Sequence, residues 1–297
     1  MRRAIFSLLL ATFAITTASA QKTVDVPNNA DKVVKIWDNS TAPHSNEESK
    51  DESLDKNNFF RNTSETVLYI YKADKQKNRG RCVVVLAGGG YGAVCIGQEG
   101  FPFAEWLKEE GITCIAVKYR LPNYGHKEVP LEDAQAALRY AREHAKELDI
   151  DPTKVGIMGC SAGGHLAAYT STFTPDEQKP NFSILFYPVI TGTTWQTHMG
   201  TFNRLLGKER TPEMTERYSL ENQVTSTTPP TILLLSDDDL VVPPISSIRY
   251  YEELKNHGVK ASMYIFPSGG HGWVGRKDFK YEQEYKHLLL DWLSTLN

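Results

Sequence analysis

A serine between two glycines is the residue of this sequence best placed for covalent chemistry. The motif Gly159-x-Ser161-x-Gly163 lies between a predicted strand and a predicted helix. A sharp turn in that context needs flanking residues without a bulky Cβ, and it projects the serine hydroxyl from the end of a sheet. The helix that follows points its first amides, including that of Ala162, toward any negative oxygen formed there. The motif therefore predicts Ser161 as a nucleophile.

A run of three glycines is the second chemical feature. Gly88-Gly89-Gly90 follows a buried apolar segment, and consecutive glycine amides can form a concave nest for a negative oxygen. A phosphate-binding loop would need Gly-Lys-Ser/Thr, and a dinucleotide-binding loop would need a complete GxGxxG at the start of a helix. The run completes neither pattern. We predict that the amides of Gly89, Gly90 and Ala162 form an oxyanion hole.

One of the eight histidines is placed to act as a general base. His271 lies in a glycine-rich turn directly after the last predicted strand, and such a turn can bring an imidazole over Ser161. His257 lies near a helix end and His287 lies inside the last helix, where neither is free to reach the serine. We predict His271 as the base.

The acid that would orient this histidine is expected after the strand at 231–236. Proteins with a serine in this strand–turn–helix motif carry the serine, the acid and the histidine in that order along the chain. Asp237, Asp238 and Asp239 all satisfy that position. The acid would fix the tautomer of His271 and stabilise its imidazolium form. Three adjacent acids are also typical of a solvated turn, so position alone separates them poorly.

Strands that alternate with helices must position these groups. Strands are predicted over 33–37, 66–71, 82–87, 112–119, 154–158, 183–187, 231–236 and 262–266, and helices over 99–110, 131–148, 162–173, 245–257 and 281–296. Short continuous apolar strands alternating with helices predict an α/β fold with a mostly parallel central sheet and helices on both faces. We predict one domain over residues 21–297.

Composition and charge exclude several classes of protein. The chain has 33 Lys+Arg against 36 Asp+Glu and a formal net charge of -3, so it has no broad positive field for nucleic acid. Its four cysteines include no CxxC pair, which argues against a structural zinc site. Cys82 and Cys114 lie on strands expected to be neighbours, so a disulfide between them is left open. The charged stretch 47–56 is expected to be a solvated loop.

The first twenty residues match the pattern of a secretory signal peptide. Arg2 and Arg3 precede a mostly apolar stretch over residues 4–15, and residues 18–20 form a small-x-small cleavage motif. A spanning helix needs roughly 20 apolar residues, and this stretch is shorter. We expect residues 1–20 to be cleaved, no membrane anchor to remain, and the protein to be periplasmic or secreted.

Taken together, these motifs resemble those of bacterial acetyl esterases of the α/β-hydrolase superfamily, of the acetyl-xylan esterase and carbohydrate esterase kind. The similarity runs from about Lys32 to the C-terminus. The motifs that carry it are Gly88-Gly89-Gly90-Tyr91, Gly159-Cys160-Ser161-Ala162-Gly163-Gly164-His165, His198-x-Gly200, Leu205-Leu206-Gly207, Asp239-Leu240-Val241-Val242-Pro243 and Gly269-Gly270-His271-Gly272. The resemblance implies an α/β-hydrolase fold, hydrolysis of O-acetyl groups on plant cell-wall sugars, no metal and no cofactor.

The resemblance also chooses among the three acids. The Asp-x-x-Val-Pro loop of many α/β-hydrolases matches the chain from Asp239 to Pro243, which favours Asp239 and leaves Asp238 as the alternative. The sequence departs from the family at Ala87, which occupies the histidine position of an HGGG-type loop. The side chain that usually anchors this loop is therefore missing, although the glycine amides remain.

Four residues are candidates for substrate contact because they fall in the glycine loop or in loops near the carboxyl ends of predicted strands. They are Tyr91, Trp195, His198 and Trp273. Aromatic faces suit the apolar C–H face of a sugar ring, although loop aromatics more often fill the core. The segment 188–230 is long enough for a helix or two and too short for a large cap domain.

The sequence therefore predicts a serine esterase that removes O-acetyl groups from carbohydrates such as acetylated xylan. The alternatives are a feruloyl or other small-ester hydrolase, a serine peptidase, or a carbohydrate-binding protein with an inactive triad. A peptidase usually has an added propeller or cap domain, for which the chain has no room. A series of p-nitrophenyl esters separates the others. The natural sugar, the position of its acetyl group and the oligomeric state stay open.

Overall fold

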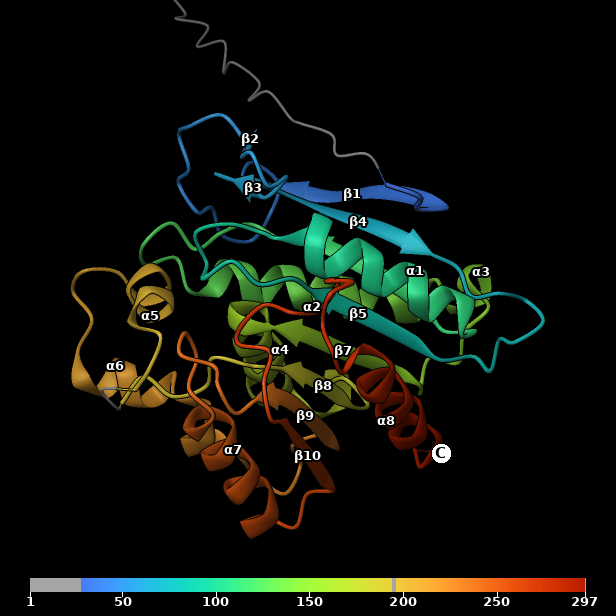
Figure 1. Ribbon diagram of the computed structural model, residues 1–297. Helices are drawn as coiled ribbons and strands as arrows, with labels where there is room; N and C mark the ends of the chain where they lie inside the picture. The colour runs from blue at the N-terminus through green and yellow to red at the C-terminus, as the bar shows by residue number, and fades with distance from the viewer. Residues whose placement is uncertain (1–27, 194–195, 297) are drawn as a thin grey trace, which may run out of the picture.

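Eight strands form one sheet in the computed structural model, which describes residues 28–193 and 196–296 (Figure 1). The order across the sheet is β1-β4-β6-β5-β7-β8-β9-β10. The bounds are β1 Lys32–Asp38, β4 Glu65–Tyr71, β5 Cys82–Leu86, β6 Thr113–Lys118, β7 Val155–Cys160, β8 Ser183–Phe186, β9 Thr231–Ser236 and β10 Ala261–Phe266. Every pairing from β6 to β10 is parallel, and the two antiparallel pairings, β1 with β4 and β4 with β6, lie at one edge. The predicted mostly parallel sheet is confirmed.

Helices cover both faces of this sheet, as the alternation of elements predicts. Figure 1 shows α1 and α8 in front of the sheet and α2 and α4 behind it. The helices are α1 Phe101–Glu109, α2 Glu128–Glu143, α3 Ala145–Leu148, α4 Ser161–Phe173, α5 Met199–Leu206, α6 Pro212–Arg217, α7 Ile245–Asn256 and α8 Glu282–Ser294. A short π-helical turn, η1 (Ile96–Gly100), precedes α1. The predicted helix at 131–148 is two helices, because the chain leaves helical geometry at His144.

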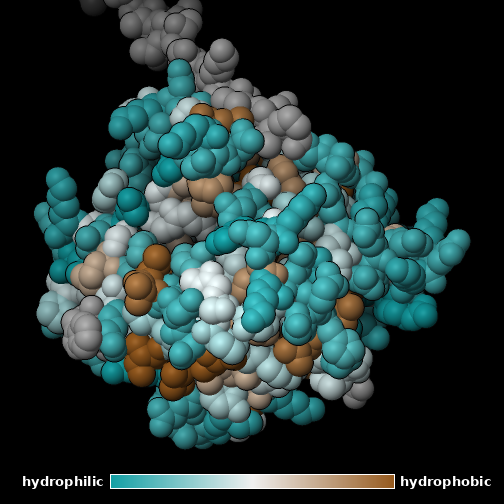
Figure 2. All heavy atoms as spheres, in the orientation of Figure 1, coloured by the Kyte–Doolittle hydropathy of each residue, from teal (hydrophilic) through white to brown (hydrophobic). Residues whose placement is uncertain are grey.

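The connection from β8 to β9 contains only short helices in its described part. These are α5, α6 and the 3-10 turn η3 (Leu220–Gln223). No helix in the described ranges is long and apolar enough to cross a membrane. The face drawn in Figure 2 is largely hydrophilic, and its apolar atoms gather toward the lower left of the view, near α7 in Figure 1. Exposed apolar side chains in and just before α7 are Leu240, Val241 and Ile248.

The charged stretch at 47–56, which we expected to be a solvated loop, is mostly exposed, with one exception. Glu52 is buried, and its Oε1 atom lies 2.7 Å from the Nζ atom of Lys118. Glu65 lies 3.0 Å from the same ammonium group. Lys118 belongs to a central strand, and a buried ammonium group needs nearby carboxylates. The ion pair therefore draws this part of the stretch inward, while the two-stranded sheet of β2 (Ser53–Leu54) and β3 (Phe60–Arg61) closes it.

The disulfide left open between Cys82 and Cys114 does not form, because both thiols are free and buried. The register pairs Cys82 with Thr113 and Val83 with Cys114. Neighbouring residues of a strand point to opposite faces, so the two thiols lie on opposite sides of the sheet.

Candidate active site

Ser161 stands at the junction of β7 and α4. Its backbone has a φ of +53°, which a residue with a side chain rarely adopts, and this conformation turns the serine out of the sheet. Gly163 permits the turn, because a Cβ there would lie 2.1 Å from the carbonyl oxygen of Leu86. The neighbouring strand therefore approaches this turn closely, and the predicted strand–turn–helix context of the motif is present.

The structure brings Ser161, His271 and Asp239 into one hydrogen-bonded chain. Ser161 Oγ lies 2.8 Å from His271 Nε2, and His271 Nδ1 lies 2.6 Å from Asp239 Oδ2. Asp239 is only 2% exposed, and its Oδ1 atom accepts the amides of Val241 and Val242, each at 2.9 Å. These amides hold the carboxylate as an acceptor, so His271 donates from Nδ1 and accepts the serine proton at Nε2.

Asp238, the alternative acid, has a different contact. Its exposed side chain accepts the amide of Gly270 at 2.8 Å and makes no hydrogen bond to His271. The amide of Asp237 donates to the carbonyl of Phe266, at the ends of β9 and β10. The geometry therefore assigns the carboxylate next to His271 to Asp239, while Asp238 fastens the loop that carries this histidine.

The three amides predicted to bind the oxyanion lie in the glycine loop and at the start of α4. Gly89 and Gly90 have φ values of +127° and +61°, and Ala162 lies in the first turn of α4. None of their amides has a hydrogen-bond acceptor among the described residues. Gly89 is required here, because a Cβ would lie 2.2 Å from the carbonyl oxygen of Ala93. The glycine loop and the helix N-terminus thus leave donors free for a substrate oxygen.

Two arginines that the sequence analysis did not single out hold the glycine loop from outside. Arg204 of α5 donates to the carbonyl of Gly90 at 3.1 Å, and Arg61 of β3 donates to the carbonyl of Gly92 at 2.9 Å. Both partners are backbone atoms far away in the chain, so no local motif marks either arginine.

His198, predicted to contact substrate, flanks this loop at the start of α5. Its Cε1 atom lies 3.2 Å from the point where a Cβ on Gly90 would stand, and its Nδ1 atom lies 2.7 Å from Thr201 Oγ1. Burial lowers the pKa of His198, and the nearby His271 and Arg204 lower it further. The lowered pKa favours the neutral imidazole beside the oxyanion loop, and contact of His198 with substrate stays a prediction.

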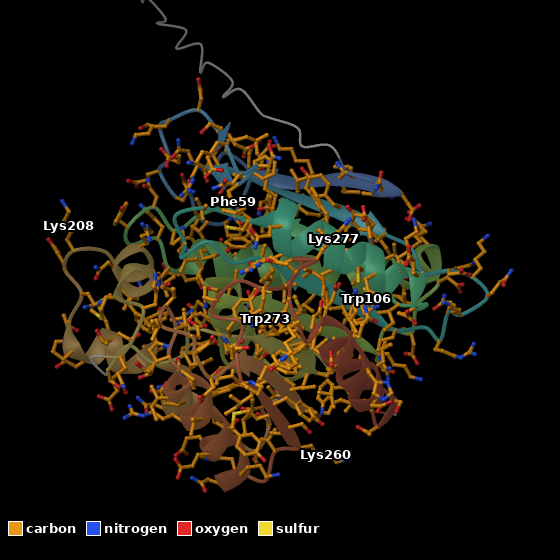
Figure 3. The ribbon with its side chains drawn as sticks, viewed as in Figure 1. Phe59, Trp106, Lys208, Lys260, Trp273 and Lys277 are labelled. Carbon is orange, nitrogen blue, oxygen red and sulfur yellow. The ribbon has the colours of Figure 1, made fainter. Side chains whose placement is uncertain are left out.

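The structure corrects the prediction for Trp273. Its side chain is 0% exposed and stacks on Phe279, with ring centroids 4.2 Å apart and planes 6° apart. The rings of Phe186 and Tyr187 also contact it at centroid distances of 5.5 and 5.1 Å. Figure 3 places Trp273 over the middle of the molecule, far from the outlying Lys208 and Lys260. The ring is therefore core packing beneath the His271 loop and not a platform for sugar.

Tyr91 is held by buried hydrogen bonds, but it also borders a pocket beside the glycine loop, so its contact with substrate stays a prediction. The Tyr91 side chain is buried, and its hydroxyl donates to His165 Nδ1 at 3.0 Å. His165 Nε2 in turn donates to the carbonyl of Tyr218 at 3.0 Å. Tyr91 therefore fastens the glycine loop to α4. Trp195 lies outside the described residues.

A small polar pocket adjoins the outer side of the glycine loop. It has a volume of about 230 Å³, and Gly92, Asn62, Asn123, Tyr124 and Arg204 are among the residues that line it. Tyr124 is 59% exposed and has a φ of +59°, so strained backbone presents its ring beside polar groups.

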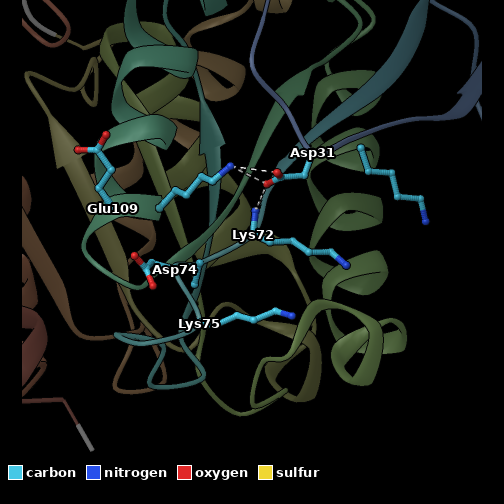
Figure 4. A pocket seen from close by; sticks show the side chains of 8 residues that line it. Asp31, Lys72, Asp74, Lys75 and Glu109 are labelled. Atoms are coloured by element: carbon cyan, nitrogen blue, oxygen red, sulfur yellow. Dashed lines mark hydrogen bonds and ion pairs between the residues drawn. The ribbon is translucent and has the colours of Figure 1, made fainter.

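A larger cavity of about 540 Å³ lies elsewhere (Figure 4). It is bordered by Lys72, which follows β4, and β4 ends opposite the start of β6. The cavity therefore lies at the amino ends of the parallel strands, whereas Ser161 follows the carboxyl end of β7. In this cavity Lys108 already pairs with Asp31 at 2.9 Å. We therefore place the chemistry at Ser161, His271 and Asp239 and not in this cavity. No group of three or more side chains suited to a metal occurs in residues 28–193 and 196–296.

Comparison with known proteins agrees with this geometry. The sequence model of the BD-FAE family matches residues 68–254, a range that includes Ser161 and Asp239. The chain belongs to the BD-FAE family. The match ends before His271, so this histidine is identified by the geometry of the site.

Several proteins resemble this BD-FAE chain over most of its length. The acetylxylan esterase of Xylanibacter ruminicola is 40% identical over 221 residues, which are 73% of this chain and 46% of that protein. Endo-1,4-beta-xylanase B of Butyrivibrio fibrisolvens is 32% identical over 225 residues, which are 71% of this chain and 34% of that protein. This chain thus spans less than half the length of these two curated relatives.

A solved structure resembles nearly the whole chain. It is the acetyl ester-xyloside bifunctional hydrolase of Caldicellulosiruptor lactoaceticus, at 32% identity and a TM-score of 0.74. The match covers 91% of this chain and 97% of that one. The α/β-hydrolase fold predicted from the sequence is therefore confirmed.

Proposed function

We propose that the protein is a serine esterase that hydrolyses O-acetyl groups on carbohydrates such as acetylated xylan or xylo-oligosaccharides. The observation that carries this proposal is the chain from Ser161 Oγ through His271 to Asp239, next to amides that have no acceptor in residues 28–193 and 196–296. This arrangement suits acyl transfer, because a nucleophile, its base and an oxyanion site meet at one point.

Each step follows from these positions. Ser161 Oγ attacks the acetyl carbon as its proton passes to His271 Nε2, and Asp239 stabilises the imidazolium. The carbonyl oxygen becomes an oxyanion held by the amides of Gly89, Gly90 and Ala162. His271 then protonates the departing sugar oxygen, which leaves an acetyl-enzyme. A water deprotonated by His271 attacks this ester and releases acetate.

The carbohydrate part of the substrate rests on two lines of support. Two similar proteins bear names that refer to acetylxylan or acetyl ester-xyloside hydrolysis. The polar pocket beside Gly92 offers an exposed aromatic ring, Tyr124, together with amide and guanidinium groups. Sugar rings are bound by this combination of an apolar face and hydrogen-bonding groups. We infer that the sugar extends from Ser161 toward this pocket.

We also propose that the protein is exported. The support is the signal-peptide pattern of residues 1–20 in the sequence. N-terminal sequencing of the protein recovered from the periplasm or the medium should begin at Gln21. Recovery of the full chain from the cytoplasm of the native host would contradict this proposal.

The test of the function is acetate release from acetylated xylo-oligosaccharides, compared with p-nitrophenyl acetate, butyrate and octanoate and with methyl ferulate. We expect acetate release, and a rate that falls with acyl length because each methylene without room costs about 1 kcal/mol or more. Tyr124→Ala should lower kcat/KM for the oligosaccharide about tenfold and leave p-nitrophenyl acetate unchanged. Faster cleavage of methyl ferulate would favour a feruloyl esterase, and no hydrolysis of any ester would favour a binding protein.

A further inference from the structure

Glu99 is a buried carboxylate directly behind the glycine loop. It lies in η1 and is 5% exposed. Its Oε2 atom accepts the amide of Gly88 at 2.6 Å, and its Oε1 atom accepts the hydroxyl of Tyr187 at 3.1 Å. No lysine or arginine in the described part of the chain pairs with it, and burial raises its pKa. A buried carboxylate without a cation is costly, so its two hydrogen bonds require an explanation.

The first hydrogen bond reaches the oxyanion hole. Gly88 immediately precedes Gly89, whose amide is one of the three free donors. A Cβ on Gly88 would lie 2.9 Å from Glu99 Oε2 and 3.0 Å from the Cβ of Ser161. The Gly88 peptide therefore lies between the Glu99 carboxylate and the nucleophile, close to both. The hydrogen bond to Glu99 holds the Gly88 peptide, which directly precedes the oxyanion donors Gly89 and Gly90.

The second hydrogen bond reaches the loop of the base. The Tyr187 hydroxyl, which donates to Glu99, accepts the amide of Val274 at 3.1 Å. The Tyr187 ring also lies in edge contact with the imidazole of His271, at a centroid distance of 4.8 Å. Glu99 thus connects the glycine loop with the loop that carries His271, through one tyrosine.

We propose that Glu99 is a positioning residue that holds the oxyanion loop in register with Ser161. It supplies the anchor that a histidine provides in HGGG-type loops, a position that Ala87 occupies here. Tyr119 completes this anchor, because its hydroxyl donates to the Ala87 carbonyl at 2.8 Å. The inference rests on the proposed function, since it concerns the oxyanion of the same reaction.

The experiment compares Glu99→Ala, Glu99→Gln and a matched control, Glu221→Gln. Glu221 is another buried carboxylate whose pKa burial raises, but it makes no hydrogen bond or ion pair with Ser161, Asp239 or His271. The readouts are kcat and KM for p-nitrophenyl acetate and the inhibition constant of phenylboronic acid, whose tetrahedral serine adduct places an oxygen in the oxyanion hole. Thermal unfolding of each variant identifies those that fold.

We expect Glu99→Ala to lower kcat about 100-fold, with KM within about threefold, because an oxyanion donor acts in the transition state. The inhibition constant of the boronic acid should rise by a similar factor. Glu99→Gln should have a kcat about tenfold higher than that of Glu99→Ala, because the glutamine side-chain oxygen can accept the Gly88 amide. Glu221→Gln should behave as the wild type does.

Three results would overturn the inference. One is a folded Glu99→Ala variant with kcat within threefold of wild type. Another is a fall in kcat without any change in boronic acid binding, which would make Glu99 a packing residue. The third is a Glu99→Gln variant that folds and is no better than the alanine variant. A wild-type protein that hydrolyses no acetyl ester would instead refute the proposed function.

Discussion

Replacing Asp239 by asparagine should slow turnover far more than the same change at Asp238. The amides of Val241 and Val242 would keep the asparagine oxygen at the Oδ1 position, so its NH2 group would face His271 Nδ1. The imidazole would then accept at Nδ1 and carry its proton on Nε2, where it cannot take the proton of Ser161. The wrong tautomer costs on the order of 10³–10⁴ in kcat, or about 4–5.5 kcal/mol of transition-state stabilisation.

The matched change at Asp238 removes the charge of an exposed side chain and keeps an oxygen for the amide of Gly270. Its kcat should stay within about threefold of wild type, since an exposed hydrogen bond contributes roughly 0.5–1.5 kcal/mol. The assay is initial-rate hydrolysis of p-nitrophenyl acetate, with circular dichroism to verify folding. An Asp239→Asn variant that retains a tenth of the wild-type kcat, or equal losses at the two positions, would refute the assignment.

Three further predictions concern the surroundings of the site. Trp273→Ala should lower the free energy of unfolding by about 3–5 kcal/mol and slow sugar and p-nitrophenyl esters by the same factor, because the buried ring contacts no substrate; a selective loss on the sugar ester would contradict this. Lys118→Met should lower the free energy of unfolding in urea by about 3–5 kcal/mol, because the carboxylates of Glu52 and Glu65 would lose this buried ammonium group; an unchanged midpoint would contradict it. Burial lowers the pKa of His165 to about 4, so the unfolded chain binds this proton first as the pH falls. Wild type should lose up to roughly 3 kcal/mol between about pH 6.5 and 4, and His165→Gln should lack this part of the loss; identical pH profiles would count against it.

The sequence was sufficient for the groups whose place follows from local turn chemistry. Ser161 lies where a strand, a glycine-flanked turn and a helix meet, and the triad histidine lies in a glycine turn after a strand. Both contexts fix the end of the sheet at which a side chain emerges. The choice of Asp239 needed a family pattern, because three adjacent acids share one strand end and only folded geometry distinguishes them.

The residues that the sequence misplaced or missed depend on contacts between distant parts of the chain. Trp273 follows a strand at the correct edge of the sheet, yet its ring turns inward because Phe279 stacks on it. The partners Lys118 and Glu52 lie 66 positions apart, so no local pattern relates them. Glu99 is the first residue of the helix predicted over 99–110, where an acid is ordinary, and the π-helical turn η1 places it beside the glycine loop. Hydrophobic periodicity in the sequence shows which face of a helix or strand is buried. It does not show which distant residue a side chain contacts.

The proposed mechanism requires an acetyl group on Ser161 during turnover. Rapid acid quenching of the enzyme with excess p-nitrophenyl acetate, followed by peptide mass spectrometry, measures this intermediate. We expect one acetyl group per chain, located on the peptide that contains Ser161, and we expect Ser161→Ala to fold, to carry no acetyl group and to be slower by on the order of 10⁴-fold. An acetyl group on another residue, or a Ser161→Ala variant that retains a tenth of the wild-type rate, would contradict the assignment of Ser161 as the nucleophile.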